Sequence, residues 1–344
     1  MSEPNTPLEA ASASAGVDEG SAGADAGVSV SEPLGLSIVA PCFNEEQGLS
    51  TFLDRTRAAS EASGLSYEIV LVDDGSRDGT WARMVEAAEA DPRVRAFRLS
   101  RNFGHQRALS AGLAQARGDR VLLIDADLQD PPEALLPMLN VMTAEGADVV
   151  YGQRRQRSGE GWFKRATAGL FYRALRWLSA TDIPADTGDF RLLTAAMVAR
   201  LNAMPEQHRF LRGMIAWLGG TQVAYPYDRE PRTAGQSGYP LGRMLSFAVD
   251  GVTGFSVAPL RLCLALAGVS LLVALGVLAY VVGSVLGGTA VQGWASLAVI
   301  LLFFQSVQLL CIGLVGEYVG RLFMEQKGRP LYVIVDRAGA DEAV

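Results

Sequence analysis

Short apolar runs alternate with helical patterns over the first half of the chain. The apolar runs predict strands at residues 36–40, 68–72, 95–99, 120–124 and 149–151. Apolar residues at helical spacing predict helices between them, at 49–60, after residue 78, and at 106–116. Strands that alternate with helices are typical of a parallel sheet covered by helices. We therefore expect an α/β domain over residues 34–238.

A much longer apolar stretch lies near the C-terminus. Residues 262–316 are 55 consecutive positions without Asp, Glu, Lys, Arg or His. One membrane span needs about 20 apolar residues, so this stretch is too long for the core helix of a soluble protein. Gly287, Gly288 and Gln292 interrupt it near the middle. We expect a two-helix transmembrane hairpin over residues 260–318, with spans at about 260–285 and 294–316.

The charges that flank the predicted hairpin indicate its orientation. The connecting loop has no positive charge, whereas basic residues lie on both outer sides: Arg243, Arg261, Arg321, Lys327, Arg329 and Arg337. Basic residues near a span favour the cytoplasmic side. We therefore expect a multi-pass protein of the inner cell membrane, with the α/β domain and both termini, including a tail at 319–344, in the cytoplasm.

An amphipathic pattern precedes the first predicted span. Within residues 239–259, Leu241, Leu245, Val249 and Val252 recur at helical spacing. A helix of this kind beside a membrane span favours an interfacial position. An ordinary amphipathic surface helix has the same periodicity and remains an alternative.

The first 33 residues differ in composition from the rest of the chain. They are rich in Ala, Ser and Gly and carry six acidic residues but no Lys or Arg, so we expect a disordered acidic tail over residues 1–33. The tail has no signal-peptide pattern. It accounts for most of the net charge of −7 and leaves the remaining chain almost neutral. A nearly neutral body argues against a nucleic acid partner.

Polar residues directly follow the first two predicted strands. In parallel α/β sheets, ligands bind at the carboxyl ends of the strands. Carboxylates there can accept hydrogen bonds from a nucleotide base or ribose. The candidates for a nucleotide-sugar pocket are Pro41, Asn44, Glu45, Asp73 and Asp74. The alternative is that residues 73–75 only turn the chain and Asp78 only caps a helix.

A pair of aspartates follows the fourth predicted strand. Residues two apart on an extended chain point the same way, so Asp125, Asp127 and Gln129 are expected to converge. Their oxygens are the hard ligands that Mg²⁺ or Mn²⁺ prefers, and such a cation also binds substrate phosphates. This DxD arrangement predicts a metal site that also contacts the nucleotide sugar. A solvated strand end is the alternative.

Seven motifs, in order, resemble the family 2 glycosyltransferases with a GT-A fold. They are SIVAPCFNEE, VLVDDGSRDGT, RNFGHQRALSAGL, IDADLQDPPE, DTGDFRLL, HRFLRG and AGQSGYPLGRM. Within that family the chain is similar to polyprenyl-phosphate sugar synthases, which include bactoprenol glucosyltransferases and dolichol-phosphate mannose synthases. The resemblance spans about residues 35–335, and the two-span ending followed by RPLY favours the bactoprenol type.

The resemblance implies a set of site residues by matched position. Pro41, Glu45, Asp74 and Asp127 are expected around the nucleotide, and Asp125, Asp127 and Gln129 around Mg²⁺ or Mn²⁺. Asp189 is expected at the catalytic centre, and Arg154, Arg165 and Arg232 at the diphosphate or the acceptor phosphate. The chain departs from its relatives at Gly238, where they often carry Lys, so a neighbouring arginine would have to compensate.

The implied reaction is transfer of a hexose from a nucleotide sugar to a polyprenyl phosphate. Because a phosphate monoester has a second pKa of about 6, the acceptor is largely ionised near neutral pH. Asp189 is therefore expected to orient the acceptor or sugar, or to stabilise positive charge at the anomeric carbon, more than to act as a strong base. Direct displacement would invert the anomeric configuration.

Other interpretations stay open at the sequence level. UDP-glucose is the favoured donor and GDP-mannose the second. A basic helix resting on anionic lipid is an alternative role for Arg155, Arg157, Arg173 and Arg176. A processive polysaccharide synthase shares the fold but should need more spans, and a non-enzymatic membrane scaffold would turn over no sugar. A homo-oligomer formed through the hairpin is a further hypothesis.

Overall fold

The computed structural model describes residues 34–155, 187–228, 258–287 and 293–339. Several sequence predictions lie outside these ranges: the acidic tail at 1–33, the interfacial helix at 239–257, and the residues Arg165, Arg232 and Gly238.

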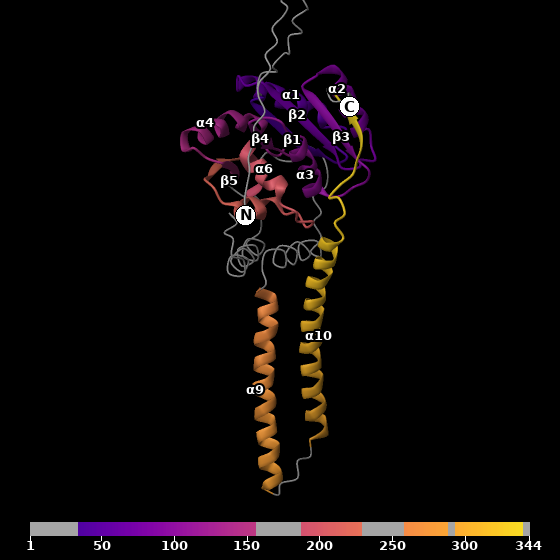
Figure 1. The fold of residues 1–344 in the computed structure, drawn as a ribbon, viewed down its shortest axis with the longest axis vertical. Coiled ribbons are helices and arrows are strands. Elements are labelled where there is room, and N and C mark those ends of the chain that lie inside the picture. Colours follow the sequence, from indigo (N-terminus) through magenta and orange to yellow (C-terminus); the bar gives the residue numbers. More distant parts are fainter. Residues whose placement is uncertain (1–33, 156–186, 229–257, 288–292, 340–344) are drawn as a thin grey trace, which may run out of the picture. The chain divides into compact units, whose positions relative to one another are not determined.

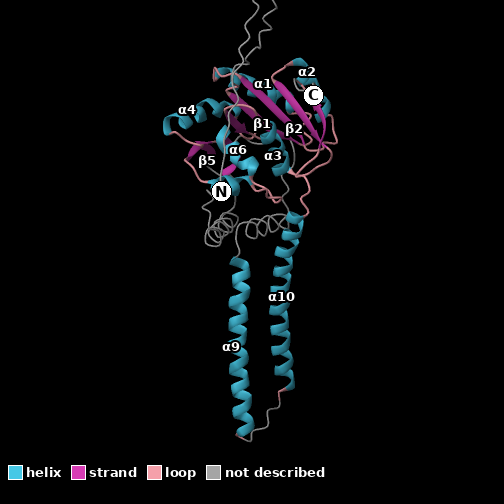
Figure 2. Ribbon diagram, viewed as in Figure 1, coloured by secondary structure: helices cyan, strands magenta, loops and turns pink. Residues whose placement is uncertain are grey.

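The strands of the described residues, magenta in Figure 2, form one sheet. Their order is β7-β5-β6-β4-β1-β2-β3-β8. Its strands are β1 (Leu36–Cys42), β2 (Tyr67–Asp73), β3 (Val94–Leu99), β4 (Arg120–Leu123), β5 (Val149–Arg154), β6 (Thr187–Thr194), β7 (Gln222–Tyr227) and β8 (Ile334–Ala338). Every residue of β1 and β2 is buried, as expected for central strands covered on both faces.

The sheet is mixed and mostly parallel, as expected from the alternation of strands and helices. β1 pairs in parallel with β2 and β4, β2 with β3, and β5 with β7. β6 runs antiparallel to both β4 and β5, and β8 runs antiparallel to β3. Insertion of β6 between β4 and β5 brings the first residues of β6, 187–191, to the carboxyl end of β4.

Helices cover both faces of this sheet. The helices are α1 (Leu49–Ala62), α2 (Thr80–Ala90), α3 (His105–Gln115), α4 (Leu135–Glu145), α6 (Ala195–Ala203) and α7 (Leu211–Leu218), with a 3-10 turn η1 (Pro132–Ala134) before α4. One apolar core gathers residues of α1, α2 and α4. A second gathers residues of α3, α6 and α7 on the opposite face. The predicted layer architecture is confirmed.

A buried ion pair lies at the amino ends of the parallel strands. Arg95 Nη1 lies 2.9 Å from Glu68 Oε2, and both side chains are almost fully buried. Glu68 Oε1 also accepts hydrogen bonds from Ser37 Oγ at 2.6 Å and Arg117 N at 2.8 Å. These partners satisfy the buried carboxylate, which would otherwise be costly to desolvate.

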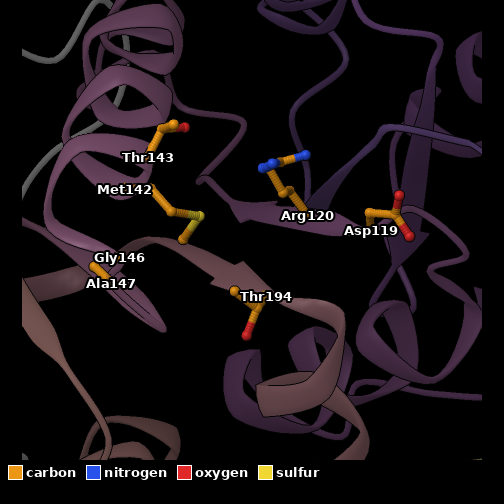
Figure 3. Close-up of a pocket in the computed structure, with 7 residues that line it drawn as sticks. All are labelled: Asp119, Arg120, Met142, Thr143, Gly146, Ala147 and Thr194. Atoms are coloured by element: carbon orange, nitrogen blue, oxygen red, sulfur yellow. The ribbon is translucent and has the colours of Figure 1, made fainter.

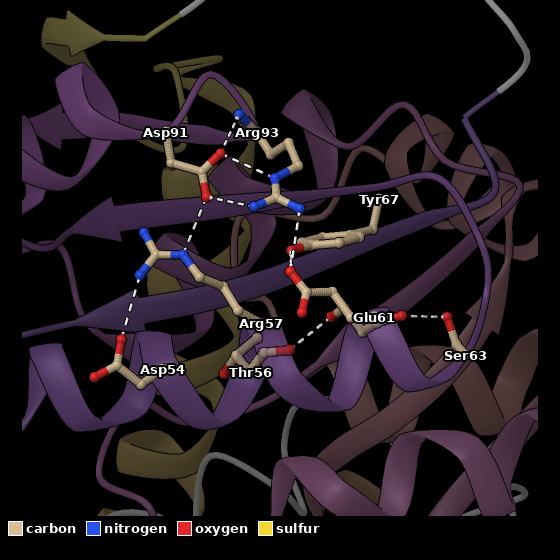
Figure 4. Close-up of polar contacts among 9 residues, drawn as sticks. Asp54, Thr56, Arg57, Glu61, Ser63, Tyr67, Asp91 and Arg93 are labelled. Atoms are coloured by element: carbon tan, nitrogen blue, oxygen red, sulfur yellow. Dashed lines mark hydrogen bonds and ion pairs between the residues drawn. The ribbon is translucent and has the colours of Figure 1, made fainter.

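A second polar network joins α1 to the turn before β3 (Figure 4). Asp91 accepts hydrogen bonds from Arg57 at 3.0 Å and from the Arg93 side chain at 2.9 Å and 3.1 Å. The Arg93 guanidinium lies over the Tyr67 ring, 4.7 Å from its centroid. The network therefore stabilises the packing of α1 against the turn before β3. None of the predicted site residues belongs to it.

The C-terminal part contains two long apolar helices, α9 (Ala258–Leu286) and α10 (Trp294–Gln326), which Figure 1 shows as the two arms of a hairpin. By length and composition, the described segment Phe303–Gln326 is long and apolar enough to cross a membrane, and Ala265–Tyr280 in α9 is a shorter apolar segment. The predicted pair of helices and the break between them are confirmed.

The region after the second predicted span is more structured than a tail. α10 continues to Gln326, and β8 then pairs with β3 at the edge of the sheet. Ser100 N donates to Val333 O at 2.9 Å, so the pairing is already set up one residue before β8 begins. The predicted tail at 319–344 therefore supplies the end of a helix and a strand of the α/β domain.

Candidate active site

Asp125 and Asp189 meet at the carboxyl end of β4. β6 runs antiparallel to β4 with Arg191 opposite Leu123, so Asp189 lies two residues further along, beside the segment that follows β4. His105, at the start of α3, lies between the two carboxylates, with Nε2 3.2 Å from Asp189 and 3.5 Å from Asp125. Residues distant in sequence thus form one cluster.

The DxD segment is a turn and not the extended chain that the sequence reasoning assumed. β4 ends at Leu123, Leu128 has a positive φ of 59°, and Gln129 N donates to Asp127 Oδ1 at 3.1 Å. Burial nevertheless alternates along the segment. Asp125, Asp127 and Gln129 are half-buried, while Ala126, Leu128 and Asp130 between them are buried. Asp130 in turn accepts a short hydrogen bond from the Tyr227 hydroxyl, which fixes the turn to β7.

The electrostatics of Asp125 indicate a surplus of negative charge. Burial and the negative charges of Asp189, Asp130 and Asp127 together raise its pKa to about 6, against the opposing effect of His105. A divalent cation would relieve this repulsion, and the available ligands are oxygens, so the residues fit Mg²⁺ or Mn²⁺.

The described residues contain no preassembled group of three or more His, Cys, Asp or Glu ligands. A cation held by Asp125 and Asp127, with Gln129 beside them, would therefore complete its shell with substrate phosphates and water, as Mg²⁺ usually does. The metal roles of these three residues remain predictions.

Asp189 is a buried carboxylate surrounded by donors. Gln106 Nε2 donates to Asp189 Oδ2 at 2.9 Å, and Arg212 Nε lies 3.1 Å from Oδ1. Burial by itself would raise the pKa of Asp189, but Arg212, His105 and Arg191 outweigh it and hold that pKa well below its usual range. The carboxylate is therefore ionised at neutral pH.

His105 is the cationic partner of both carboxylates. Burial would lower the pKa of its imidazole, but the hydrogen bond to Asp189 and the charges of Asp125 and Asp189 raise it to about 9. Sequence reasoning gave no role to His105, Gln106 or Arg212. All three lie in motifs that carry the family resemblance, RNFGHQRALSAGL and HRFLRG. Their place in these motifs was the sequence feature that could have pointed to them.

The loops after β1 and β2 brace each other. Asn44 has a positive φ of 56°. Its side-chain oxygen accepts a hydrogen bond from Arg77 N at 2.9 Å, and its own N–H donates to Ser76 Oγ at 3.0 Å. Glu45 N donates to Thr80 Oγ1 at 2.9 Å. Pro41 lies in the buried end of β1. The structure brings these candidates together, and their contacts with a nucleotide remain predictions.

The two aspartates after β2 hold backbone groups. Asp73 is fully buried and accepts Ser76 N at 2.9 Å. Asp74 accepts Phe103 N at 2.7 Å and Gly104 N at 2.9 Å, directly before His105. Asp74 therefore positions the start of α3, and any contact with the nucleotide would be additional to that role.

Arg154, at the end of β5, lies beside the cluster of Asp125, Asp189 and His105. A Cβ added at Gly188 would be 3.1 Å from Arg154 Nη2, so the guanidinium lies against the residue that precedes Asp189. Burial would lower the pKa of Arg154, but Tyr227 and the charges of Asp130 and Asp125 raise it. The position suits a cation for a phosphate group, as predicted for this residue.

A shallow hollow at the opposite end of β4 contains none of the predicted site residues. Figure 3 shows its lining, with Asp119 and Arg120 at the start of β4, Thr194 at the end of β6 and Met142 on α4. Because it lies at the amino end of β4, it is separate from the Asp125 and Asp189 cluster.

Comparison with known proteins identifies the family. Residues 37–201 match the model of glycosyl transferase family 2, and residues 258–322 match the GtrB C-terminal hairpin. The chain belongs to glycosyl transferase family 2. The bactoprenol glucosyl transferase of Shigella phage SfV is 38% identical over 303 residues, which cover 87% of this chain and 97% of the relative.

Two further relatives have similar coverage. The uncharacterized glycosyltransferase YkcC of Bacillus subtilis is 40% identical over 316 residues, covering 91% of this chain and 97% of its own. A prophage bactoprenol glucosyl transferase homolog of Escherichia coli is 38% identical over 303 residues, covering 87% of this chain and 98% of the relative.

Among solved structures, glucosyl-3-phosphoglycerate synthase of Mycobacterium tuberculosis with Mn²⁺ and UDP-glucose aligns with a TM-score of 0.43 at 21% identity, covering 64% of this chain and 78% of that one.

The family match settles the enzyme class. The protein is a glycosyltransferase with a GT-A-type α/β domain and a C-terminal helical hairpin. The alternative of a non-enzymatic scaffold is not supported.

Proposed function

We propose that this glycosyltransferase transfers glucose from UDP-glucose to a polyprenyl phosphate such as undecaprenyl phosphate, with inversion at the anomeric carbon. The observation that carries the proposal is the similarity to bactoprenol glucosyl transferases, which covers 97% of the phage relative and includes the C-terminal hairpin. The clustered Asp125, Asp127 and Asp189 supply the charge pattern that such a reaction needs.

The donor end of the site is built from the segment after β4. Asp125 and Asp127, with Gln129, would hold Mg²⁺ or Mn²⁺ beside the nucleoside diphosphate. When bound, the cation neutralises negative charge that develops on the leaving diphosphate. Arg154 lies close enough to Asp189 to contribute a second positive charge to a phosphate.

Asp189 acts through its charge in this proposal. Its pKa is held low by Arg212, His105 and Arg191, so it is a weak proton acceptor. The acceptor phosphate is already largely ionised because its second pKa is about 6. The carboxylate therefore orients the acceptor or sugar and stabilises positive charge at the anomeric carbon, and direct attack by the phosphate inverts the configuration.

The lipid acceptor agrees with the C-terminal hairpin. At about 1.5 Å per residue, the 33 residues of α10 extend further than the roughly 30 Å of a bilayer core. We propose that α9 and α10 cross the inner membrane with the catalytic domain and both termini on the cytoplasmic side, where nucleotide sugars are available. A homo-oligomer formed through the hairpin is part of the same hypothesis.

The test is transfer of radiolabelled sugar to undecaprenyl phosphate from UDP-glucose and, in parallel, from GDP-mannose. We expect label in lipid from UDP-glucose with Mg²⁺ or Mn²⁺, loss of label with EDTA, and a loss of at least about 100-fold in Asp127→Asn. Asp119→Asn is the matched control, because Asp119 is exposed at the opposite end of β4.

Each other result has a defined meaning. Preferential label from GDP-mannose would identify a mannose synthase. Label in a growing polysaccharide would favour a processive synthase. No labelled lipid from folded protein, with these two donors and with a wider panel of nucleotide sugars, would overturn the polyprenyl-phosphate proposal.

A further inference from the structure

The loop before α7 contacts the C-terminal end of α10. Glu325 accepts hydrogen bonds from Gln207 N, at 2.8 Å and 3.1 Å to its two oxygens, and from His208 N at 3.4 Å. The Gln207 side chain donates to Arg329 O at 2.8 Å, just beyond the helix. One backbone segment of the catalytic domain is thus bonded to the last turn of the hairpin and to the residues after it.

The position of Glu325 is unfavourable for α10 alone. α10 ends at Gln326, and a negative charge in the last turn is repelled by the unpaired carbonyl groups of the helix end. The two backbone N–H groups of residues 207 and 208 offset that repulsion. A carboxylate here is therefore explained by the contact with the loop and not by helix stability.

The other end of the same segment contacts the catalytic carboxylate. Gln106 Oε1 accepts Leu211 N at 2.9 Å, while its Nε2 donates to Asp189 at 2.9 Å. Arg212 Nε lies 3.1 Å from Asp189, and its Nη1 donates to Thr187 O at 3.0 Å. Arg212 therefore contacts Asp189 directly, and Leu211 is linked to it through Gln106.

Arg209 fixes the middle of the segment. Its guanidinium donates to Leu201 O at 2.9 Å and to Met204 O at 2.6 Å, the carbonyl groups at the end of α6. Residues 207–212, which we term the α7 lead-in, are thus tied to α10 at one end, to α6 in the middle, and to Asp189 at the other. A backbone held at three points has little freedom to place Arg212 elsewhere.

We propose that Glu325 and Gln106 are positioning residues that hold the α7 lead-in between the end of α10 and Asp189. The inference rests on the proposed catalytic role of Asp189. In this arrangement the hairpin helps to hold the active-site residues in place, in addition to anchoring the protein. Seating of α10 in the bilayer then favours the arrangement of Arg212 and Asp189 in which the lipid phosphate attacks.

The test compares Glu325→Ala with Glu317→Ala in the full chain, reconstituted in lipid nanodiscs. Glu317 is the matched control because it lies on the same helix and pairs with Arg321 one turn away. We expect Glu325→Ala to lower kcat about tenfold, since small displacements of catalytic groups cost up to about 100-fold. KM for UDP-glucose and the affinity for UDP with Mn²⁺ should stay within about twofold, and Glu325→Gln should retain more activity than Glu325→Ala.

A double variant separates positioning from general loss of structure. Gln106→Ala breaks one of the two links between the lead-in and Asp189. If Glu325 acts through the lead-in, the loss in the double variant is therefore smaller than the product of the two single losses. Multiplying losses, or a Glu325→Ala kcat within about twofold of the Glu317→Ala value, would overturn the proposal.

Hydrogen exchange provides a readout that is independent of the proposed reaction. Peptides covering residues 207–212 should exchange faster in Glu325→Ala than in the wild type and in Glu317→Ala. Unchanged exchange there would overturn the inference, whatever sugar the enzyme transfers. Faster exchange in a protein whose wild type labels no lipid would instead locate the failure in the proposed function.

Discussion

The charges around Asp189 decide which role this carboxylate can have. Burial opposes ionisation, but Arg212 and the protonated His105 outweigh it. A general base needs a pKa near the working pH, whereas Asp189 is held far below it. At the scale of single residues, the site is arranged for electrostatic stabilisation.

Asp189→Asn tests this role through its pH dependence. We expect kcat to fall by about 100-fold or more, the range found when one preorganised electrostatic group is removed. Because Asp189 is ionised throughout pH 6–8, its own titration adds no pH dependence to the ratio of wild-type to variant kcat. Any change in that ratio should follow His105, whose pKa falls when Asp189 is removed. A loss that disappears as the acceptor phosphate becomes fully ionised would instead support base catalysis.

Arg95 is expected to contribute to stability and not to catalysis, and its substitution tests this. Its partner Glu68 is buried at the amino ends of the strands, away from Asp189, so removing the guanidinium leaves an unpaired buried charge. Arg95→Met should lower the free energy of unfolding by about 3 kcal/mol, measured by urea unfolding in detergent. The kcat of the folded variant should match the wild type, and a kcat loss comparable to that of Asp189→Asn would contradict the assignment.

At the scale of elements, the start of α3 depends on the loop after β2. Gly75 has a φ of +70°, and a Cβ there would lie 2.6 Å from the backbone of Arg101 and Asn102. Asp74, its neighbour, holds Phe103 N and Gly104 N. The loop thus sets where α3 begins, and with it the positions of His105 and Gln106.

Gly75→Ala should therefore reduce activity as well as stability. The added Cβ pushes the 101–104 backbone away and displaces His105 and Gln106 from Asp189, so we expect kcat to fall at least about tenfold. Gly64→Ala is the control, because Gly64 has the same φ of +70° but no atoms within 4 Å of the new Cβ. That variant should lose only about 1 kcal/mol of stability from backbone strain. Equal kcat in the two variants would contradict the role of this loop.

At the scale of the whole molecule, the chain returns from the hairpin to the sheet. β8 covers the edge of β3, and Ile334 packs against the core on the α3 side. The catalytic domain is therefore discontinuous in sequence, since its edge strand follows α10. An uncovered β3 would present unpaired backbone groups that favour aggregation.

A comparison of two truncated chains tests the contribution of β8. One chain ends at residue 257, and the other joins residue 257 to residues 328–339 through a Gly/Ser linker. We expect the linked chain to unfold several degrees higher in a thermal scan, since a stabilisation of about 1 kcal/mol raises Tm by about 2–4 °C at this size. Equal Tm values and equal aggregation would show that β8 contributes little.

The sequence by itself predicted the first five strands, the helices between them and the candidate chemistry at the strand ends, but not β6, β7 or β8. The apolar runs placed β1 and β2 within two residues of their observed bounds, and the long uncharged stretch predicted α9 and α10. These features follow from local periodicity, which depends on neighbouring residues alone. The DxD pair was predicted from its position after a buried strand, and Asp189 from a motif that carries the family resemblance.

Only the tertiary structure decided which distant residues meet. Pairing of β6 with β4 brings Asp189 to Asp125, and packing of α3 and α7 adds His105, Gln106 and Arg212. The contact between Glu325 and the α7 lead-in, and the return of β8 to β3, join the hairpin to that site. No local pattern encodes such pairings, because the free energy that selects them comes from burying whole faces of the sheet and its helices together.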